Sequence, residues 1–593
     1  MTGSNDIISL YRARLAEEKG AVKKDWGGRL SIALIYPNYY RLGMSNLGFQ
    51  IVYQILNERS GVVAERVFLP EGQEMSLYLR SGKPLLSLES QRPLYEFDLI
   101  AFSLSFENDY PNVLHILELA GIPLYSEERS GSMPLVMAGG ITTFLNPEPI
   151  SPFVDVFLLG EAEANLKEFI DLFSESYSDS ATRDEVIRNL AKNMPGLYVP
   201  RFYRAEYHRD GTLRAFLPKE DQVPEKIRVA CSDKGGFAEN RAPMSAITTP
   251  DTEFSNKILI ELGRGCGHSC RFCAAGYVYR PPRPYDDSQL CAVVQKAMES
   301  SKEVGLISPA VSDVPGVEAL MAMIVERGGS FSVSSLRAET LTEGLLDQLK
   351  STGQKTITIA PEAGSERLRR IINKHLTRDQ IIETIRMISR TGDFSVRLYF
   401  LIGLPSETDD DMGEIVELVK KIKHEMVKES AARGRIGRIK LSVNCFVPKA
   451  FTPFQWFPLE DVASLKKKQK WLKKSLAKAG GIQISSDIPK WAYVQALLSM
   501  GDRRVSSILL LAHQSGGDWA RALKFSDINP DFFVYRPKRI GELLPWDFID
   551  NGISKKHLSK EHYLALKGEE SDICHVGECY RCGVCGTPGN KNP

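Results

Sequence analysis

The sequence has little of what would carry the chain into or across a membrane. No apolar run approaches the ~18 residues that a spanning helix requires. The first residues, Met-Thr-Gly-Ser-Asn-Asp, lack a basic stretch followed by an apolar one, so no secretory signal is visible. The formal net charge of +1 gives no global signature of binding to nucleic acid or to a membrane surface. We therefore expect a cytoplasmic protein with no membrane partner.

The cysteines lack the distribution of a disulfide framework. Of ten cysteines, seven fall into two short clusters, which is typical of metal ligands kept reduced in the cytosol. The other three, Cys231, Cys291 and Cys445, have no partner evident in the sequence and are expected to be structural. With 593 residues, the chain is long enough for three or four domains.

The first cluster, Cys266, Cys270 and Cys273, lies in the run Glu-Leu-Gly-Arg-Gly-Cys-Gly-His-Ser-Cys-Arg-Phe-Cys. Three thiolates at this spacing reach only three irons of a four-iron cluster and leave the fourth open to an exchangeable ligand. Zinc is the alternative, with His268 as the fourth ligand. The motif resembles that of the radical S-adenosylmethionine (SAM) superfamily, in which the open iron chelates SAM and a [4Fe–4S] electron cleaves it to a 5′-deoxyadenosyl radical. This resemblance implies a radical SAM enzyme, with Phe272 beside the adenine.

From Lys257 to about Pro458 apolar strands alternate with helical patterns. The expected strands are Ile258–Leu262, Glu303–Ser308, Ser330–Ser334, Thr356–Ala360, Ser395–Ile402 and Lys440–Val447. Six such strands fit the partial (β/α)6 barrel of the radical SAM superfamily, which we place at residues 251–458. Functional side chains on such barrels collect at the carboxyl ends of the strands. The stretch Val447–Trp456 is similar to one in methylthiotransferase-like and cobalamin-dependent radical SAM proteins and would line the substrate side.

Polar motifs follow these strands, and by resemblance to the family they would bind SAM. Ser312 or Asp313 would meet the methionyl amino group, and Arg337 would pair with the methionyl carboxylate through its planar fork. Glu362 would accept hydrogen bonds from the ribose hydroxyls, and Gly403 would let the backbone close on the adenine. Taken singly, each is alternatively a polar residue that caps a strand end.

Residues 31–175 show another alternation of strands and helices. The expected strands are Ser31–Tyr36, Val62–Phe68, Leu99–Leu104, Leu135–Ala138 and Val154–Leu158. With helices such as Leu47–Arg59 between them, they predict an α/β domain with a parallel, doubly wound, Rossmann-like sheet. Ligands of such sheets sit at the carboxyl ends of the strands. No G-x-G-x-x-G opens the first helix, so a dinucleotide site is not expected.

The loops at those strand ends resemble the cobalamin-binding domain that precedes many radical SAM domains. The resemblance lies in the runs Val136–Pro149 and Phe153–Glu163. It implies a cobalamin groove lined by Ser103, Ser105, Gly139, Gly140 and Thr142 and closed by Gly160 and Glu161. The D-x-H-x-x-G motif that supplies a histidine to cobalt is absent, and the mid-helix His115 is expected to pack or to face solvent. The alternative is a Rossmann-like scaffold without a cofactor.

The remaining segments carry fewer motifs. Residues 1–30 predict a helical extension, residues 176–250 a proline-rich connector with β structure, and residues 459–593 a helical region. Residues 417–479 contain 16 Lys and Arg against 5 Asp and Glu, and Leu459–Lys478 predicts a basic amphipathic helix. Such a surface can hold RNA, or it can be a solvated lysine face.

The second cysteine cluster comprises Cys574, Cys579, Cys582 and Cys585. Four thiols this close predict a metal site, which is either an auxiliary iron–sulfur cluster or zinc. An iron–sulfur cluster here would relay electrons, whereas a structural site would brace the domain.

Over nearly its whole length the chain resembles cobalamin-binding-domain radical SAM proteins. The stretches Tyr36–Gln50 and Leu544–Ser554 are similar to a bacterial subgroup of that family without a settled activity. The resemblance implies an enzyme that methylates an unactivated carbon of a small molecule or RNA, with SAM, cobalamin and an electron donor of the flavodoxin or ferredoxin type. One alternative is radical chemistry without methylation, namely cyclisation, rearrangement or sulfur insertion. Another is an RNA-binding module whose cofactor domains are regulatory.

Overall fold

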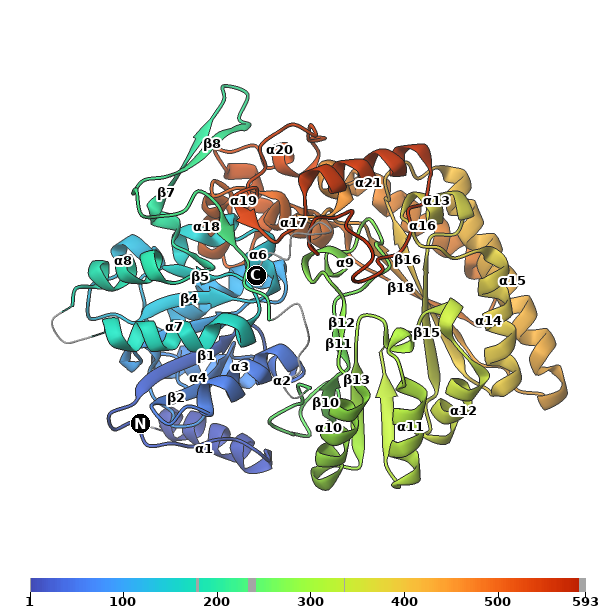
Figure 1. Ribbon diagram of the computed structural model, residues 1–593, viewed down its shortest axis with the longest axis horizontal. Coiled ribbons are helices and arrows are strands. Elements are labelled where there is room, and N and C mark those ends of the chain that lie inside the picture. Colours follow the sequence, from blue (N-terminus) through green and yellow to red (C-terminus); the bar gives the residue numbers. More distant parts are fainter. Residues whose placement is uncertain (1, 178–180, 233–241, 335, 586–593) are drawn as a thin grey trace.

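The computed structural model describes residues 2–177, 181–232, 242–334 and 336–585. Two α/β bodies stand side by side, the first coloured blue to teal and the second green to gold in Figure 1. Helices of the carboxyl-terminal region lie across the top of both. The predicted α/β class is confirmed.

The first body is built on a six-stranded sheet with strand order β2-β1-β3-β4-β5-β6. Its strands are β1 (Leu30–Tyr36), β2 (Val62–Phe68), β3 (Leu99–Ser103), β4 (Leu135–Gly139), β5 (Val156–Leu158) and β6 (Leu197–Tyr198). The first five are parallel, and β6 is antiparallel to β5. The order 2-1-3-4-5 is that of flavodoxin-like doubly wound sheets, whose ligands bind where the order reverses, beside β1 and β3.

Helices cover this sheet because its strands are largely apolar on both faces; β5, for example, consists of three buried apolar residues. The helices are α1 (Thr2–Glu17), α2 (Tyr40–Met44), α3 (Leu47–Asn57), α4 (Gly72–Ser81), α5 (Tyr110–Leu119), α6 (Ile141–Leu145), α7 (Ala162–Ser176) and α8 (Arg183–Asn193). Helices α3 and α7 pack against each other. Since α8 and β6 lie beyond residue 175, this body extends into the segment that the sequence predicts as a connector.

The second body holds seven parallel strands in two sheets, β10-β13-β14 and β15-β16-β17-β18. They are β10 (Ile258–Glu261), β13 (Glu303–Ile307), β14 (Ser330–Val333), β15 (Thr356–Glu362), β16 (Ser395–Ile402), β17 (Ile439–Cys445) and β18 (Ile482–Ser486). A parallel bridge between Leu336 and Ile359 joins the two sheets into one curved wall. All six predicted strands are present, and β18 is an additional one in the segment that the sequence predicts as helical.

The helices of this second body follow its strands. They are α9 (Ala275–Val278), α10 (Asp287–Ser300), α11 (Val317–Glu326), α12 (Glu343–Ser351), α13 (Glu366–Ile371), α14 (Arg378–Thr391) and α15 (Asp409–Ser430). Side chains of Asp286, Thr377 and Thr408 cap the starts of α10, α14 and α15 and so fix where three of them begin.

The connector contains the antiparallel hairpin β7 (Tyr203–Tyr207) and β8 (Leu213–Pro218) and the short strand β9 (Ile227–Arg228). Strand β9 pairs with β19 (Ile549–Asp550), so the connector is tied to the carboxyl-terminal region. That region contributes α16 (Val462–Ala477), α17 (Pro489–Met500), α18 (Val505–Gln514), α19 (Trp519–Phe525), α20 (Asp531–Val534) and α21 (Lys555–Lys567). The predicted basic helix is confirmed as α16. Among the described residues, no helix is long and apolar enough to cross a bilayer.

Candidate functional site

The loop after β10 carries Cys266, Cys270 and Cys273, and a two-stranded ladder closes its base. Strands β11 (Gly263–Arg264) and β12 (Arg283–Pro284) form that antiparallel ladder. Gly265 has a φ of +82°, and a Cβ there would lie 2.4 Å from the carbonyl oxygen of Tyr279. The bend one residue before Cys266 therefore requires glycine.

A buried arginine fixes the same loop from the other side. The Arg271 guanidinium is fully buried and donates to the Glu561 carboxylate on α21 at 3.1 Å. It also donates to the carbonyl oxygens of Ile371 at 2.9 Å and Glu569 at 2.8 Å. The thiols are thus held by contacts to the barrel and to the carboxyl-terminal region together.

The spacing of the thiols bears on which metal they fit. Tetrahedral zinc with bonds of about 2.3 Å brings its sulfur ligands to about 3.8 Å from one another. Among the residues that the structure describes, the three donor groups that gather within 4.8 Å are His115, Glu118 and His513, and no set of three cysteines does so. Burial raises the pKa of Cys273 to about 12, with the neighbouring thiols adding to the effect. Among the described residues, therefore, no three cysteines lie as close together as a single tetrahedral zinc ion would hold them.

Three of the residues expected to bind SAM, Ser312, Asp313 and Arg337, lie near these thiols. The His268 ring contacts the Asp313 carboxylate, and Thr340 donates to Ser312 at 2.6 Å. Arg337 is near enough to Cys266, Cys270 and Asp313 for their charges to interact, and it pairs with Glu339. Buried atoms here have no hydrogen-bond partner, namely His268 Nδ1, Arg337 Nε and Glu339 Oε2. Unsatisfied buried donors and acceptors of this kind fit a site for a polar, zwitterionic ligand.

Glu362 lies at the carboxyl end of β15 in a strained backbone conformation. Its φ is +64°, which is uncommon for a residue with a side chain and costs about 1–3 kcal/mol. Burial raises the pKa of its carboxyl above the ordinary value, and Lys374 Nζ lies 3.9 Å away. Such strain at a strand end is typical of a residue aimed at a ligand.

The other two residues expected to bind SAM, Phe272 and Gly403, contact apolar side chains of the protein. Phe272 packs on a small apolar cluster at the ends of β15–β17 that includes Ala363, Leu404 and Phe446. A Cβ on Gly403 would lie 2.8 Å from Leu465 of α16. The close approach at Gly403 is therefore to a helix of the protein, which accounts for this glycine without a bound adenine.

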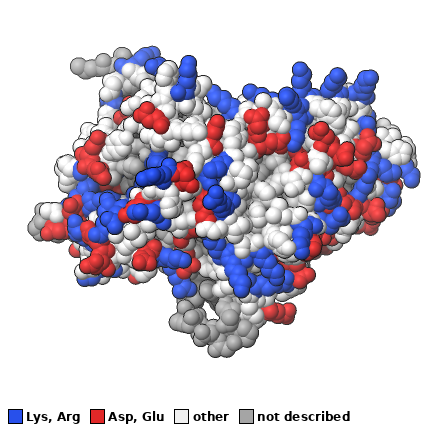
Figure 2. Space-filling model, turned by 90° about the horizontal axis from the view of Figure 1, so that it is seen from above, with Lys and Arg blue, Asp and Glu red and all other residues white. Residues whose placement is uncertain are grey.

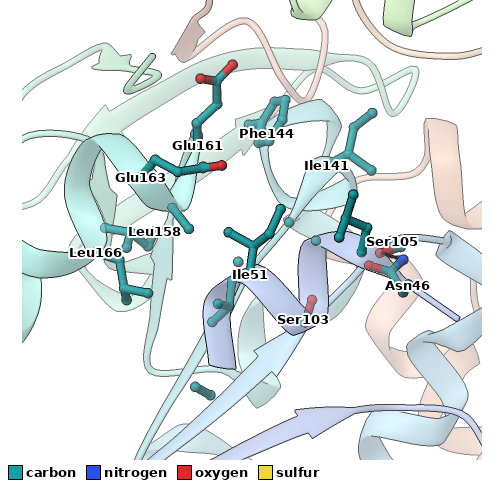
Figure 3. Close-up of a pocket in the computed structure, with 18 of the residues that line it drawn as sticks. Asn46, Ile51, Ser103, Ser105, Ile141, Phe144, Leu158, Glu161, Glu163 and Leu166 are labelled. Carbon is teal, nitrogen blue, oxygen red and sulfur yellow. Dashed lines mark hydrogen bonds between the residues drawn. The ribbon is translucent and has the colours of Figure 1, made fainter. Parts of the chain in front are cut away.

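A cavity of about 580 Å³ lies between the two bodies and reaches into the first one. Its floor is apolar and runs between the sheet and helices α3 and α7, past Ile32, Ile51, Ala101, Leu166 and Ile170. Protein interiors are close-packed, so a void of this size within a domain is typical of a ligand site. Figure 3 shows Glu161 and Glu163 on one side of it and Asn46 with Ser105 on the other.

Six of the seven residues expected to bind cobalamin line this cavity: Ser103, Ser105, Gly139, Gly140, Gly160 and Glu161. Thr142 does not; it is buried, and its hydroxyl donates to the Leu104 carbonyl oxygen at 3.1 Å. The cavity contains Asn165, whose Oδ1 is buried and has no partner. No described histidine lines it, and His115 packs against His513 instead, with ring centroids 6.1 Å apart. Small residues at the rim, an apolar floor and an unsatisfied amide fit a large flat ligand with a nucleotide-like tail.

The far wall of the cavity belongs to the cysteine loop, which the sequence does not reveal. The lining residues of this wall are Arg264, Gly265, Ala275 and Tyr279, together with Ile307–Pro309 at the carboxyl end of β13. Hence a molecule in the cavity would lie beside the loop of Cys266, Cys270 and Cys273.

Buried ion pairs lock the two walls together. Arg264 pairs with Glu163 at 2.8 Å and with Glu261 at 2.9 Å, and Arg283 pairs with Glu161. Burial alone would raise the pKa of Glu163, but Arg264 outweighs it and the pKa is lowered. Glu161 and Glu163 are in the predicted loop, whereas Arg283 and Arg264 are more than a hundred residues away along the chain, so only the structure brings these pairs together.

Comparisons with known proteins point to one family. Residues 48–200 match the family described as radical SAM proteins, N-terminal, and residues 260–419 match the radical SAM superfamily. The protein MJ0966 of Methanocaldococcus jannaschii is 29% identical over 81% of this chain and 90% of its own length. A tRNA-2-methylthio-N(6)-dimethylallyladenosine synthase of Petrotoga mobilis is 23% identical over 31% of this chain and 46% of its own.

Two further proteins are similar over part or most of the chain. The ribosomal protein uS12 methylthiotransferase RimO of Clostridioides difficile is 24% identical over 30% of this chain and 42% of its own length. The chain thus spans less than half of either methylthiotransferase. The structure of the cobalamin-dependent SAM radical enzyme OxsB with aqua-cobalamin and SAM bound covers 95% of this chain and 84% of its own, at a TM-score of 0.44 and 12% identity.

Proposed function

Because the chain belongs to the radical SAM superfamily, we propose that it is a cobalamin-dependent radical SAM enzyme that methylates an unactivated carbon. The [4Fe–4S] cluster and SAM supply the 5′-deoxyadenosyl radical, and cobalamin would supply the methyl group. The protein itself would position these groups relative to one another and exclude water from them.

The barrel residues would orient SAM. Arg337 presents a planar fork suited to the methionyl carboxylate, and Asp313 presents an acceptor suited to the methionyl ammonium. Cys266, Cys270 and Cys273 would ligate three irons and leave the fourth to chelate that amino acid end. Glu362, held by backbone strain and facing Lys374, would accept from the ribose hydroxyls.

The first body would hold cobalamin. Ser103, Ser105 and Gly139 form a rim without bulky side chains, and the floor between the sheet and α3 offers an apolar slot for the nucleotide tail. No described histidine is positioned to ligate cobalt from this cavity. We therefore propose that Ser103, Ser105 and Gly139 would hold the corrin through small side chains and backbone, without a histidine from the described lining.

One observation carries the proposal: a single cavity is lined both by the small-residue rim of the first body and by Gly265 and Ala275 of the cysteine loop. A methyl donor and a radical source must lie close together, because the radical formed on the substrate has to meet the methyl group before it reacts elsewhere. A scaffold without a cofactor would have no reason to keep this space open.

The test is anaerobic purification with cobalamin, followed by reconstitution and assay with SAM and a chemical reductant. We expect bound corrinoid in the absorption spectrum and release of 5′-deoxyadenosine. A protein that cleaves SAM but takes up no corrinoid would contradict the methylcobalamin part and leave non-methylating radical chemistry. A protein that neither binds corrinoid nor cleaves SAM would contradict both the methylcobalamin part and the radical SAM part of the proposal.

RNA is the substrate class that one surface favours. Lys466, Lys467, Lys470, Lys473 and Lys474 are exposed on α16 beside the exposed Trp471, whereas Lys468 is paired with Glu407 and Glu460. Exposed lysines next to an aromatic ring fit a phosphate backbone with unstacked bases. Figure 2 shows both charge signs mingled on the face seen from above, so any such contact is local.

This second candidate is tested with a transcribed tRNA as the probe. Changing Lys470, Lys473 and Lys474 together to Glu should weaken binding at least tenfold and flatten its dependence on salt. Lys296→Glu, an exposed lysine on α10, is the matched control and should change neither. Equal effects of the two variants would leave α16 as a solvated lysine face.

A further inference from the structure

The carboxyl-terminal segment crosses the loop of the first cysteine cluster. The backbone N–H of Cys574 donates to the Gly267 carbonyl oxygen at 2.8 Å. The N–H of Ser571 donates to Asn373 Oδ1 at 2.8 Å, and Asn373 in turn donates to the Ser269 carbonyl oxygen at 3.3 Å. The loop of Cys266 and the loop of Cys574 are therefore in direct backbone contact.

One buried cation touches both loops. Arg280 is 5% exposed; its guanidinium donates to Ser269 Oγ at 2.6 Å and to the Gly276 carbonyl oxygen at 2.7 Å. The same group hydrogen-bonds the side chain of Cys582 and lies within charge interaction of Cys574. A positive charge buried between two thiol clusters is costly unless it faces negative charge. Two iron–sulfur clusters with thiolate ligands would supply that charge on both sides.

The four thiols of the tail form a built site. Cys582 is 3% exposed, and its carbonyl oxygen accepts from the N–H of Ser554 at the start of α21 at 2.9 Å. Cys574 is near enough to Cys579, Cys582 and Cys585 for its charge to interact with each of them. Yet no three described cysteines come within 4.8 Å of each other, which is wider than the roughly 3.8 Å of tetrahedral zinc.

We propose that Cys574, Cys579, Cys582 and Cys585 hold a second iron–sulfur cluster that passes electrons to the first, with Arg280 as the positioning residue between them. This rests on the proposed function, since the first cluster is its acceptor. A one-electron donor of the flavodoxin or ferredoxin class reduces the second cluster by one electron, and the first cluster receives that electron. The first cluster then gives it to SAM, whose S–C5′ bond breaks into methionine and the 5′-deoxyadenosyl radical.

Metal content tests the identity of the site. Wild type should contain about eight iron atoms per chain and no zinc. Two double variants should each retain about four iron atoms: Cys582→Ser/Cys585→Ser, which removes the second cluster, and Cys266→Ser/Cys270→Ser, which removes the first. After reduction, the second of these variants should show an EPR signal from the tail cluster alone. Cys291→Ser on α10, outside both clusters, is the control and should keep the wild-type content. About four iron atoms plus one zinc in wild type would overturn the second cluster.

The relay is tested by comparing two reductants. Dithionite is small and can reduce the first cluster directly, whereas a flavodoxin has to dock. In Cys582→Ser/Cys585→Ser, the ratio of flavodoxin-driven to dithionite-driven SAM cleavage should fall at least tenfold. An unchanged ratio would mean that the tail only braces the loop.

Arg280 is tested by redox titration followed by EPR. Because a cation beside a cluster favours its reduced, more negative form, Arg280→Gln should shift the midpoint potential of the second cluster to more negative values. Arg280→Lys keeps the charge and should lie between Gln and wild type. Equal potentials in all three would contradict the role of Arg280. If wild type contains about eight iron atoms but does not cleave SAM, the proposed function is contradicted, whereas the second cluster is still supported.

Discussion

Gly139 sits at the cavity rim in an ordinary backbone conformation, and this makes it a clean probe. A Cβ there would meet only the Leu158 carbonyl oxygen, at 3.6 Å, so a side chain can be added without backbone strain. Gly139→Leu should project into the cavity and weaken cobalamin binding at least tenfold, or about 1.4 kcal/mol. Titration of the apoprotein with cobalamin, followed by absorption, measures this.

Gly413 in α15 provides the control for that substitution. A Cβ at this position meets nothing within 4 Å, and the residue does not line the cavity. Gly413→Leu should leave corrinoid affinity unchanged. If both variants bind cobalamin as wild type does, the cavity is not the corrinoid site.

Asp109 predicts a pH dependence of stability. It is 5% exposed and accepts from Asn38 at 2.7 Å, and burial raises its pKa to about 6. The unfolded carboxyl ionises near pH 4, so between about pH 4 and 6 the folded state binds more protons, and stability falls as the pH rises. Asp109→Asn should therefore be more stable than wild type by about 3 kcal/mol above pH 6, and this difference should shrink towards pH 4. Urea unfolding at several pH values checks this; a pH-independent difference would refute the assignment.

At the scale of elements, α21 connects the two cysteine loops. Its Glu561 is buried and accepts from Arg271 at 3.1 Å and from Ser571 at 2.8 Å. Glu561→Ala leaves Arg271 buried without its carboxylate, which should cost about 3 kcal/mol of stability and loosen iron at both loops. Iron release to a chelator and thermal unfolding measure the two effects. Lys560→Ala, the exposed neighbour, should change neither, and equal behaviour of the two variants would contradict the connecting role of α21.

The strands were predictable because their apolar runs are short, β-branched and separated by helical patterns. Val62–Phe68 and Ser395–Ile402 match β2 and β16 residue for residue. Strand β18 escaped prediction because Ile482–Ser486 has only two large apolar residues, which are half-buried, and it follows a basic helix. Its place at the sheet edge comes from pairing with β17, a contact that a local pattern does not encode.

On the scale of the whole molecule, the carboxyl-terminal region ties the first body to the barrel. Asn146 donates to the carbonyl oxygens of Ser499 and Gly501 at 3.1 and 2.7 Å, and Lys449 pairs with Glu107 at 2.6 Å. Helix α18 packs on α5. The two halves should therefore unfold together.

Arg503 tests that coupling. It pairs with the buried Glu148 at 2.8 Å and donates to the Tyr198 hydroxyl at 3.0 Å. Arg503→Ala would leave the buried Glu148 carboxylate without its cationic partner, which should lower the free energy of unfolding by about 3 kcal/mol. The single calorimetric transition should then separate into two. Arg521→Ala on α19, an exposed arginine, is the control. A single, unshifted transition in Arg503→Ala would show that the halves are held together elsewhere.

The candidate site was predictable only at its rim. Ser103 and Gly139 stand out in the sequence because small polar residues follow apolar strands, and they do line the cavity. Ile51 and Leu166 line the floor of the cavity. Their helical spacing is that of any residue facing a hydrophobic core, so the sequence pattern does not distinguish a cavity wall from a packed core. Thr142 belongs to the same loop but does not line the cavity, and its hydroxyl donates to the Leu104 carbonyl oxygen, a contact that the sequence pattern does not reveal.

The contact between Arg271 and α21 also has a consequence for biosynthesis. A ribosome that has just made Arg271 must add 290 more residues before Glu561 exists, which takes roughly 15–60 s at 5–20 residues per second. During that interval the nascent loop has its three thiols but not the carboxylate that fixes it. Iron bound at that stage would be ligated by a loop that lacks its Glu561 contact, so we expect the cluster to be inserted after translation is complete. A prematurely terminated polypeptide should therefore be unable to retain its metal.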